Sequence, residues 1–260
     1  MRPRPGDAPV AETAPAKDAV GDPPAEAVIV VMPAYNEAGC IEAVVREWMA
    51  AVGLMIVVND GSRDETPRIL DRLAAELPGL RVVHQSNAGH GAALLNGYRA
   101  AVAAGAAWVF QTDSDGQFLA TDFPLLWDQR QRSRFLLGRR EQRDDHPVRI
   151  WLSGIHAMLL RGLFGVNLAD PNVPYRLMHI PLLERYLPRI PTDTFAPNVM
   201  LSILAARDGH DLGFVPVNHR ARQTGVVSIR GWKTFKVGLL VFGQLWAFRR
   251  ALRSRAHRAE

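Results

Sequence analysis

Several features that would define a protein class are scarce in this sequence. A single cysteine, Cys40, among 260 residues excludes an intramolecular disulfide framework and is typical of a reducing compartment. Residues 1–26 contain no apolar stretch of the roughly 7–15 residues that a secretory signal needs, so we expect a cytoplasmic protein. The same segment holds six of the 18 prolines and almost no large apolar side chain, which predicts disorder.

Charge is abundant but unevenly distributed. The chain carries 31 Lys and Arg against 26 Asp and Glu, a net charge of +5, and this basicity alone would suggest a nucleic-acid partner. Residues 1–26 have a net charge of −2, residues 230–260 have +7, and the 203 residues between them hold 20 charges of each sign. A neutral body with a basic tail therefore disfavours nucleic acid as the partner.

The residues after position 26 alternate between two hydrophobic patterns. Continuous apolar runs typical of buried strands occupy 27–32, 54–58, 80–84 and 107–111, and helical patterns occupy 41–52, 64–77 and 92–104. This alternation predicts an α/β fold with a mostly parallel sheet flanked by helices. Further on we expect helices at 123–132, 148–164 and 198–207, strands at 135–138, 175–179 and 212–217, and amphipathic helices within 232–255.

Polar clusters follow the four apolar runs, at the sheet edge where such folds bind ligands. Asp113 and Asp115 can converge on one Mg²⁺ or Mn²⁺ ion, with Gln117 adding an amide oxygen, although a solvated acidic turn has the same pattern. Asp60 can accept hydrogen bonds from a nucleotide base or ribose, or belong to an ordinary turn. Glycines 89 and 91 allow a backbone approach to phosphate, or simply form a glycine turn.

Taken together, the four clusters resemble family-2 glycosyltransferases of the GT-A (Rossmann-like) fold. The matching segments are VVMPAYNEAG (30–39), VVNDGSRDET (57–66), SNAGHGAALLNGY (86–98) and QTDSDGQF (111–118). The resemblance implies a nucleoside-diphosphate sugar donor, GDP- or UDP-linked, and a Mg²⁺ or Mn²⁺ ion held by Asp113, Asp115 and Gln117. The donor site it implies consists of Pro33, Ala34, Tyr35, Glu37, Asp60, Gly89, Asp113, Ser114 and Arg176.

The second half of the chain is most similar to polyprenyl-phosphate (dolichyl-phosphate-type) mannosyl- and glucosyltransferases. That resemblance implies that Arg139, Arg149 and Ser153 hold the acceptor phosphate, and Arg149 and Ser153 share one helix face at i, i+4 spacing. It also implies that Arg176 contacts the donor phosphates. Two places depart from the pattern: Asn198 replaces an acidic residue, and Val227-Ser228, without a lysine, stands where the pattern has Ser-Lys after the glycine that matches Gly225.

The missing acid at position 198 bears on the acceptor. An inverting transfer to a hydroxyl group needs a general base, for which Asp170 and Asp193 are candidates, with His146, His156 and His219 as alternatives. An ionised phosphate acceptor needs no base and depends on positioning and metal charge. The sequence therefore favours a polyprenyl phosphate acceptor over a hydroxyl on a lipid, glycan or secondary metabolite. A non-catalytic nucleotide-sugar binder or membrane adaptor is the alternative from another functional class.

The basic tail contains aromatic residues at helical spacing. Its apolar run, residues 237–248, would span roughly 18 Å as a helix, short of the ~30 Å hydrocarbon core. Aromatic side chains flanked by bases predict a helix at the interface of an anionic membrane. A helix packed on the catalytic domain, or paired with a membrane subunit, is the alternative. We thus expect a disordered segment at 1–26, a glycosyltransferase domain at 27–229, an interfacial tail at 230–260, and a peripheral enzyme on the cytoplasmic membrane face.

Overall fold

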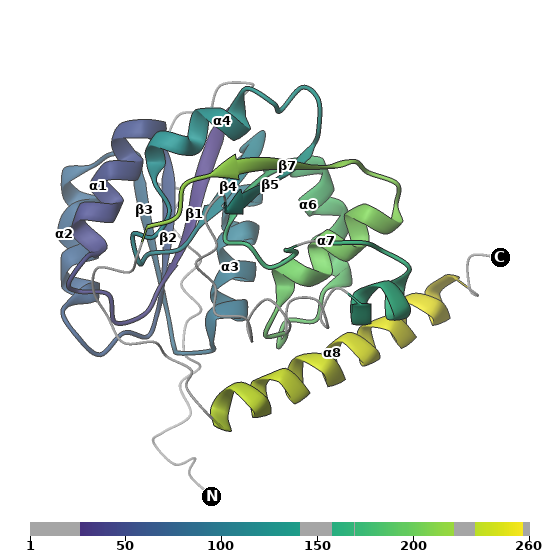
Figure 1. The fold of residues 1–260 in the computed structure, drawn as a ribbon. Helices are drawn as coiled ribbons and strands as arrows, with labels where there is room; N and C mark the ends of the chain where they lie inside the picture. The colour runs from purple at the N-terminus through teal and green to yellow at the C-terminus, as the bar shows by residue number, and fades with distance from the viewer. Residues whose placement is uncertain (1–26, 141–157, 169, 221–231, 257–260) are drawn as a thin grey trace, which may run out of the picture.

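The structure, a computed structural model, describes residues 27–140, 158–168, 170–220 and 232–256 (Figure 1). The strands are β1 (Val28–Ala34), β2 (Met55–Asp60), β3 (Leu80–Gln85), β4 (Trp108–Thr112), β5 (Phe135–Arg140), β6 (Tyr175–His179) and β7 (Leu212–Val217). The helices are α1 (Ile41–Val52), α2 (Thr66–Glu76), α3 (His90–Ala103), η1 (Ala120–Asp122), α4 (Phe123–Trp127), α6 (Ile180–Tyr186), η2 (Leu187–Arg189), α7 (Pro197–Arg207) and α8 (Trp232–Ala256). Residues 158–164 are also helical.

The strands form one seven-stranded sheet in the order β3-β2-β1-β4-β6-β5-β7. Neighbouring strands are parallel except that β6 runs antiparallel to both β4 and β5. The carboxyl ends of all the other strands therefore meet at one edge, together with the amino end of β6. The order reverses between β1 and β4, which is the place where open α/β sheets bind ligands.

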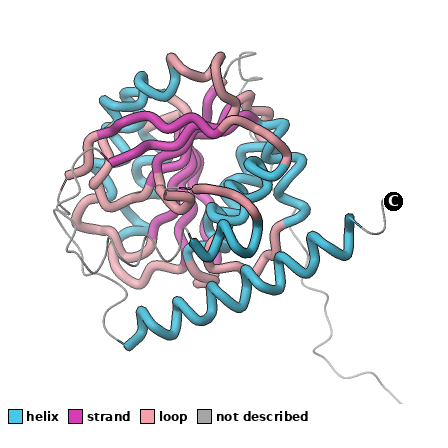
Figure 2. Tube along the Cα trace, turned by 45° about the vertical axis from the view of Figure 1, so that its right-hand side comes forward, coloured by secondary structure: helices cyan, strands magenta, loops and turns pink. Residues whose placement is uncertain are grey.

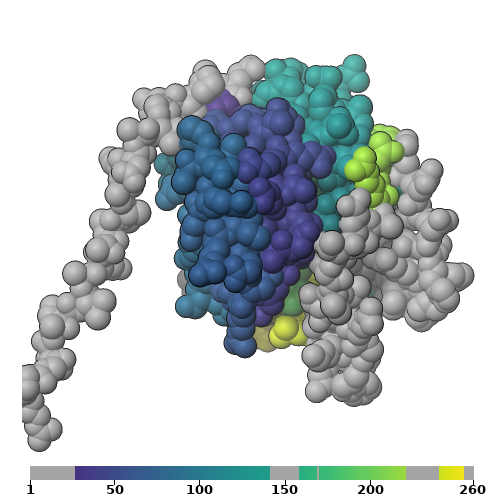
Figure 3. Space-filling model, turned by 90° about the vertical axis from the view of Figure 1, so that its left-hand side faces the viewer, coloured from purple at the N-terminus to yellow at the C-terminus, as the bar shows by residue number. Residues whose placement is uncertain are grey.

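Helices cover both faces of the sheet because the chain reverses direction. The crossovers through α1 and α2 step from β1 to β3, whereas α3 leads back to β4 on the far side of β1. Since such crossovers are right-handed, α1 and α2 lie on one face and α3 on the other, where it packs against α6 and α7. Every residue of β2 and β4 is buried, as coverage on both faces requires. In Figure 3 the purple and blue residues, from the N-terminal part of the described chain, form one continuous surface.

Alternation along β4 separates two kinds of core. Phe110 faces α1 and packs against Trp48 and Tyr175, with ring centroids 5.0 and 4.7 Å away. The next residue, Gln111, faces the opposite side, where it pairs in register with Arg176 of β6. The sheet thus has an aromatic core on the α1 face and a polar group on the α3 face, directly beneath the ligand-binding edge.

α8 packs along one side of the domain (Figures 1 and 2). Its Leu245, Phe248 and Leu252 are buried, and Phe248 meets Phe164 with ring centroids 6.2 Å apart. The Gln244 side chain accepts a hydrogen bond from the Phe195 amide at 2.9 Å and donates to the Asp193 carbonyl at 3.0 Å. Within the described part of the chain, no helix is both long and apolar enough to cross a membrane.

Most predicted elements are confirmed, and the differences have local causes. The strands at 175–179 and 212–217 and the helix at 41–52 have the predicted bounds. The helix predicted at 123–132 ends at Trp127, and α6 was not predicted. The antiparallel direction of β6 was not predicted either, because strand direction leaves no mark on hydrophobic periodicity. Part of the helix predicted at 148–164, and the segment 1–26, lie outside the described residues.

Candidate active site

The loops after β1 and β2 are joined into one ledge by backbone amides. Asn36 has a φ of +55°, and its amide donates to the Ser62 hydroxyl at 2.9 Å while its side-chain oxygen accepts from the Arg63 amide at 2.8 Å. The amides of the next two residues, 37 and 38, donate to the side chains of Thr66 and Asp64. Asp64 also accepts from the Thr66 amide at the start of α2, the capping role that its position predicts. Much of the segment 59–66 therefore serves to fix the neighbouring loop.

The donor-site residues expected at the end of β1 and in the loop after it differ in how exposed they are. Pro33 and Ala34 are the last two residues of β1, and both are buried. Tyr35 is 43% exposed, so its ring is free to stack on a flat ligand at the sheet edge. Glu37 is half-buried, and its carboxylate accepts a hydrogen bond from the Cys40 thiol at 3.4 Å.

Asp60 clamps the loop that follows β3. Its carboxylate accepts hydrogen bonds from the Gln85 side chain at 2.8 Å and from the amides of Ala88 and Gly89 at 2.8 and 2.9 Å. Gly61 follows with a φ of +67°, and a Cβ there would lie 2.6 Å from the Asn87 amide nitrogen. The Gly89 amide and Asp60, both expected in the donor site, therefore bind each other.

Asp113 and Asp115 lie just beyond β4, at the centre of the sheet edge. The pKa of Asp113 is raised to about 6, mainly by burial; the negative charge of Asp115 also acts to raise it, whereas His90, Arg140 and Arg176 act to lower it. Asp115 accepts a hydrogen bond from the Gln117 amide at 3.1 Å, which closes a tight turn at Gly116, just after the buried Ser114. The Gln117 side chain donates to the Arg220 carbonyl at 3.2 Å and so ties this turn to the segment after β7.

This pair of carboxylates fits a divalent cation that it shares with a substrate. Two half-buried carboxyl groups of like charge oppose each other's ionisation, and a cation between them would remove that penalty. Among the described residues no group of three or more His, Cys, Asp or Glu side chains gathers in metal-binding geometry. A cation at this place would be held by Asp113 and Asp115, and substrate or water oxygens would complete its coordination shell, as is usual for Mg²⁺.

Arg176 is a correction to the expected site. Its guanidinium is completely buried and donates hydrogen bonds to the carbonyls of Pro171, Val173 and Asn198 and to the Ser202 hydroxyl, at 2.7–3.5 Å. All five N–H groups have a partner within the protein, and burial lowers the pKa of Arg176 to about 10. The side chain stabilises the junction of β6 and α7 and has no donor left for a phosphate.

The comparisons with known proteins decide the family. The family model of glycosyl transferase family 2 matches residues 29–187, more than half of the chain. The chain belongs to glycosyl transferase family 2. It is therefore a glycosyltransferase, as the sequence motifs indicated.

Relatives and solved structures place this glycosyltransferase more closely. It is 27% identical over 80% of its length to polyprenol monophosphomannose synthase of Mycolicibacterium smegmatis, covering 83% of that protein. It is 26% identical over 78% of its length to undecaprenyl-phosphate mannosyltransferase of Micrococcus luteus, covering 88% of that protein. Glucosyl-3-phosphoglycerate synthase of Mycobacterium tuberculosis, solved with Mn²⁺, uridine diphosphate and phosphoglyceric acid, matches with a TM-score of 0.64 at 20% identity, covering 86% of this chain and 78% of that one. The structural match confirms the predicted GT-A fold.

Only some of the basic residues expected in the site of this glycosyltransferase are among the described residues. Arg149 and Ser153, expected to hold the acceptor phosphate, lie outside the described residues, as do His146 and His156. Arg139 and Arg140 end β5 at the same edge as Asp113, and the positive charge of Arg140 acts on Asp113.

Other side chains reach the site without having been predicted there. His90, at the start of α3, lowers the pKa of Asp113 through its charge. Gln111 donates to the Asp113 carboxylate at 3.3 Å, and Asn198 donates to Gln111 at 3.1 Å. The candidate base Asp170 is half-buried and acts electrostatically on Arg176, as Asp113 does, whereas Asp193 is exposed.

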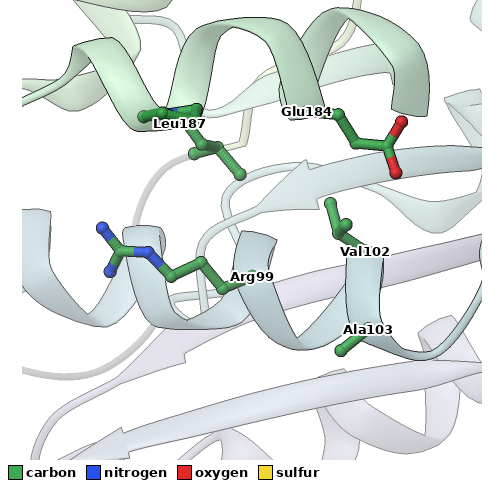
Figure 4. A pocket seen from close by; sticks show the side chains of 6 residues that line it. Arg99, Val102, Ala103, Glu184 and Leu187 are labelled. Atoms are coloured by element: carbon green, nitrogen blue, oxygen red, sulfur yellow. The ribbon is translucent and has the colours of Figure 1, made fainter.

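A hollow of about 400 Å³ lies elsewhere, between α3 and α6 (Figure 4). It is lined by Arg99, Val102, Ala103, Glu184, Leu187 and Pro188. The α3 residues in this group belong to its last turns, whereas His90 at its first residue faces Asp113. At 1.5 Å per residue the two places are separated by roughly the length of the helix. This hollow is therefore not part of the catalytic edge.

Proposed function

We propose that this enzyme transfers a sugar, with inversion, from a GDP- or UDP-linked donor to a polyprenyl phosphate at the cytoplasmic face of a membrane, with Mg²⁺ or Mn²⁺. The observation that carries this proposal is the position of Asp113 and Asp115 at the carboxyl end of β4, beside the point where the strand order reverses. Both carboxylates lie at the place where GT-A folds bring the ends of the donor loops together.

The donor half of the proposal is supported by the ledge next to these carboxylates. The loops after β1 and β2 are fixed to each other, and Asp60 fixes the loop after β3, so the edge is preorganised before a ligand arrives. Tyr35 offers an exposed ring for a base, and the remaining lone pairs of Asp60 can accept from it. When bound, the cation would neutralise the charge that develops on the departing nucleoside diphosphate. The similarity in fold to the Mycobacterium tuberculosis synthase, which was solved with Mn²⁺ and uridine diphosphate, supports this assignment.

The acceptor half rests on the relatives and on charge. Both named relatives act on polyprenyl phosphates, and they cover most of this chain. Arg140 brings a positive charge to the edge near Asp113, where an anionic acceptor has to approach. A phosphate oxygen attacks without losing a proton, so the enzyme would need no base there. A hydroxyl acceptor would instead depend on Asp170, which is half-buried beside Arg176.

The membrane location is supported by the outer face of α8. Leu240, Phe242 and Trp246 are 41–51% exposed, although their neighbours on the inner face are buried. The rings of Phe242 and Trp246 lie 6.4 Å apart, and the Arg249 guanidinium sits 5.6 Å from the Trp246 ring. Exposed apolar anchors next to bases are the composition of a helix that lies on an anionic leaflet.

A transfer assay tests the reaction. Purified enzyme is incubated with labelled GDP-mannose, UDP-glucose and other nucleotide sugars, Mn²⁺, and either undecaprenyl phosphate or undecaprenol. We expect label only in the phosphate-containing lipid, and we expect Asp115→Asn to abolish it because the cation is misplaced. Transfer to the free alcohol that is lost in Asp170→Asn would favour the hydroxyl acceptor. If no lipid is labelled with any donor, the proposed reaction is wrong.

A flotation assay tests the location. Trp246→Ser should reduce binding to vesicles that contain phosphatidylglycerol by up to about tenfold, because one interfacial anchor is lost. Leu125→Ser is the matched control, since Leu125 is 46% exposed on α4, on the opposite side of the domain from α8 (Figure 1). Equal binding of both variants and wild type would contradict membrane docking through α8. Binding only in the presence of a second membrane protein would favour a membrane subunit.

A further inference from the structure

Three buried polar side chains, those of Tyr98, Asn198 and Gln111, lie directly beneath Asp113 on the α3 face of the sheet. Each donates a hydrogen bond to the next, and we call them the donor chain. The Tyr98 hydroxyl of α3 donates to the Asn198 side-chain oxygen at 2.7 Å, and the Asn198 amide group donates to the Gln111 oxygen at 3.1 Å. Gln111 then donates to the Asp113 carboxylate at 3.3 Å. Tyr98, Asn198 and Gln111 are each no more than 1% exposed, so water does not compete for these groups.

The hydrogen bonds of the donor chain all run in one direction, so the orientation of each side chain fixes that of the next. A phenol donates one hydrogen bond, and burial raises the pKa of Tyr98, so the hydroxyl keeps its proton. The Asn198 oxygen has to face this donor, which turns its NH₂ group toward Gln111. The same logic turns the NH₂ group of Gln111 toward Asp113. If either amide were reversed, an oxygen of Gln111 would face an ionised carboxylate and repel it.

The backbone carbonyl of Asn198 has contacts of its own, apart from the hydrogen bonds of its side chain. Arg176 donates to the Asn198 backbone carbonyl at 3.1 Å, and the Ser202 hydroxyl donates to the same carbonyl at 2.9 Å. Arg176 is fixed in turn by the carbonyls of Pro171 and Val173. A buried polar network is favourable only when every member is satisfied, and here each donor of the chain has its acceptor. The one end that reaches the ligand edge is Asp113.

We propose that Asn198 and Gln111 are positioning residues that hold the Asp113 carboxylate ready for the divalent cation. The inference rests on the proposed function, since it assumes that Asp113 binds a metal ion. It assigns to α7, which is distant in sequence from the acidic turn, the role of orienting a metal ligand. Hydrogen bonds of this kind behind a metal ligand typically change metal affinity about ten- to a hundredfold.

The discriminating variant is Asn198→Asp, which has the same shape but the opposite hydrogen-bonding character. An ionised Asp at this position accepts from Tyr98 and also from Gln111, so the Gln111 amide reverses and presents its oxygen to Asp113. Ser202→Ala is the matched control. It lies one turn further along α7 and loses a buried hydrogen bond to the same carbonyl without touching the donor chain.

Metal binding is measured without turnover, by the electron paramagnetic resonance signal of free Mn²⁺ titrated into metal-free protein, alone and with UDP or GDP. We expect Asn198→Asp to weaken Mn²⁺ binding about ten- to a hundredfold and to change the spectrum of the bound ion, while Ser202→Ala stays within about twofold of wild type. Circular dichroism verifies that each variant is folded. If Asn198→Asp does not fold, Tyr98→Phe replaces it, with a smaller loss in the same direction.

Three results would overturn the inference, and they are distinguishable. If wild type binds Mn²⁺ but the folded variants of the donor chain bind it equally well, the chain does not position Asp113, and the proposed function stands. If wild type binds no Mn²⁺ with or without either nucleotide, the metal assignment in the proposed function fails, and the inference fails with it. If Ser202→Ala weakens binding as much as Asn198→Asp, the effect is a general one of α7 packing and the donor chain has no specific role.

Discussion

Replacing Asp113 by Asn should make the metal-free protein more stable while it removes activity. The ordinary pKa of this carboxyl is 3.8, and burial followed by the charge of Asp115 raises it to about 6. Above pH 6 the folded protein therefore carries a carboxylate that the fold disfavours. The difference corresponds to up to about 3 kcal/mol, an upper value because part of the group faces solvent.

The sign of the pH dependence follows from proton binding. Between pH 3.8 and about 6 the folded state holds the Asp113 proton more tightly than the unfolded state, so this group lowers the stability of the fold as the pH rises. An Asn side chain does not titrate and keeps an oxygen for the Gln111 hydrogen bond. The stability gain of Asp113→Asn should then be up to about 3 kcal/mol at pH 8 and roughly half of that at pH 5.

The assay is urea denaturation of wild type and variant in EDTA at both pH values, followed by circular dichroism. Asp128→Asn is the control, because Asp128 is exposed at the end of α4 and its replacement should change stability by no more than about 0.5 kcal/mol. Added Mn²⁺ should stabilise wild type and leave Asp113→Asn almost unchanged. The reasoning is refuted if Asp113→Asn is no more stable than wild type at pH 8, or if its advantage is the same at pH 5.

Three further predictions concern side chains whose hydrogen bonds hold parts of the fold together. Arg176→Lys should lower the free energy of unfolding by roughly 3–5 kcal/mol in urea denaturation, because the guanidinium that serves three carbonyls is lost. The KM for the sugar donor, measured on the folded fraction, should stay near that of wild type. A stable variant with a tenfold higher KM would restore the phosphate role. Asp60→Ala should lower the free energy of unfolding by about 2–4 kcal/mol and raise the donor KM, because the loop after β3 loses its anchor, and a loss below about 0.5 kcal/mol would contradict the clamp. Gln244→Ala should cost about 1–2 kcal/mol and speed up tryptic cleavage within α8, whereas unchanged cleavage would mean that the apolar contacts of α8 suffice.

The edge residues show how far sequence reasoning reaches. Asp113 and Asp115 could be located from the sequence because they follow a wholly apolar run, and a buried strand has to deliver its next polar residues to the sheet edge. The role of Asp60 could not be settled in this way. An acidic residue after a strand has the same pattern whether its carboxylate serves a ligand alone or, as in this structure, also binds the amides of the following loop.

The buried side chains of Arg176, Gln111 and Asn198 have roles that sequence reasoning could not predict. Arg176 stands in the sequence next to Tyr175 like any strand residue, and the family resemblance implied a phosphate contact. Only the tertiary structure brings α7 and the segment before β6 around it, and these supply the carbonyls that take its hydrogens. Gln111 and Asn198 are 87 residues apart and have no shared motif, so their hydrogen bond follows from the meeting of β4 and α7 alone.

The sequence by itself determined the alternation of strands and helices, the family, the acidic turn and the basic, aromatic tail, because each of these depends on neighbours along the chain. The tertiary structure decided the antiparallel β6, the burial of Arg176 and the donor chain beneath Asp113. It also showed that α8 packs through one face and leaves Phe242 and Trp246 exposed on the other. These outcomes depend on which surfaces meet in space, and hydrophobic periodicity carries no information about distant partners.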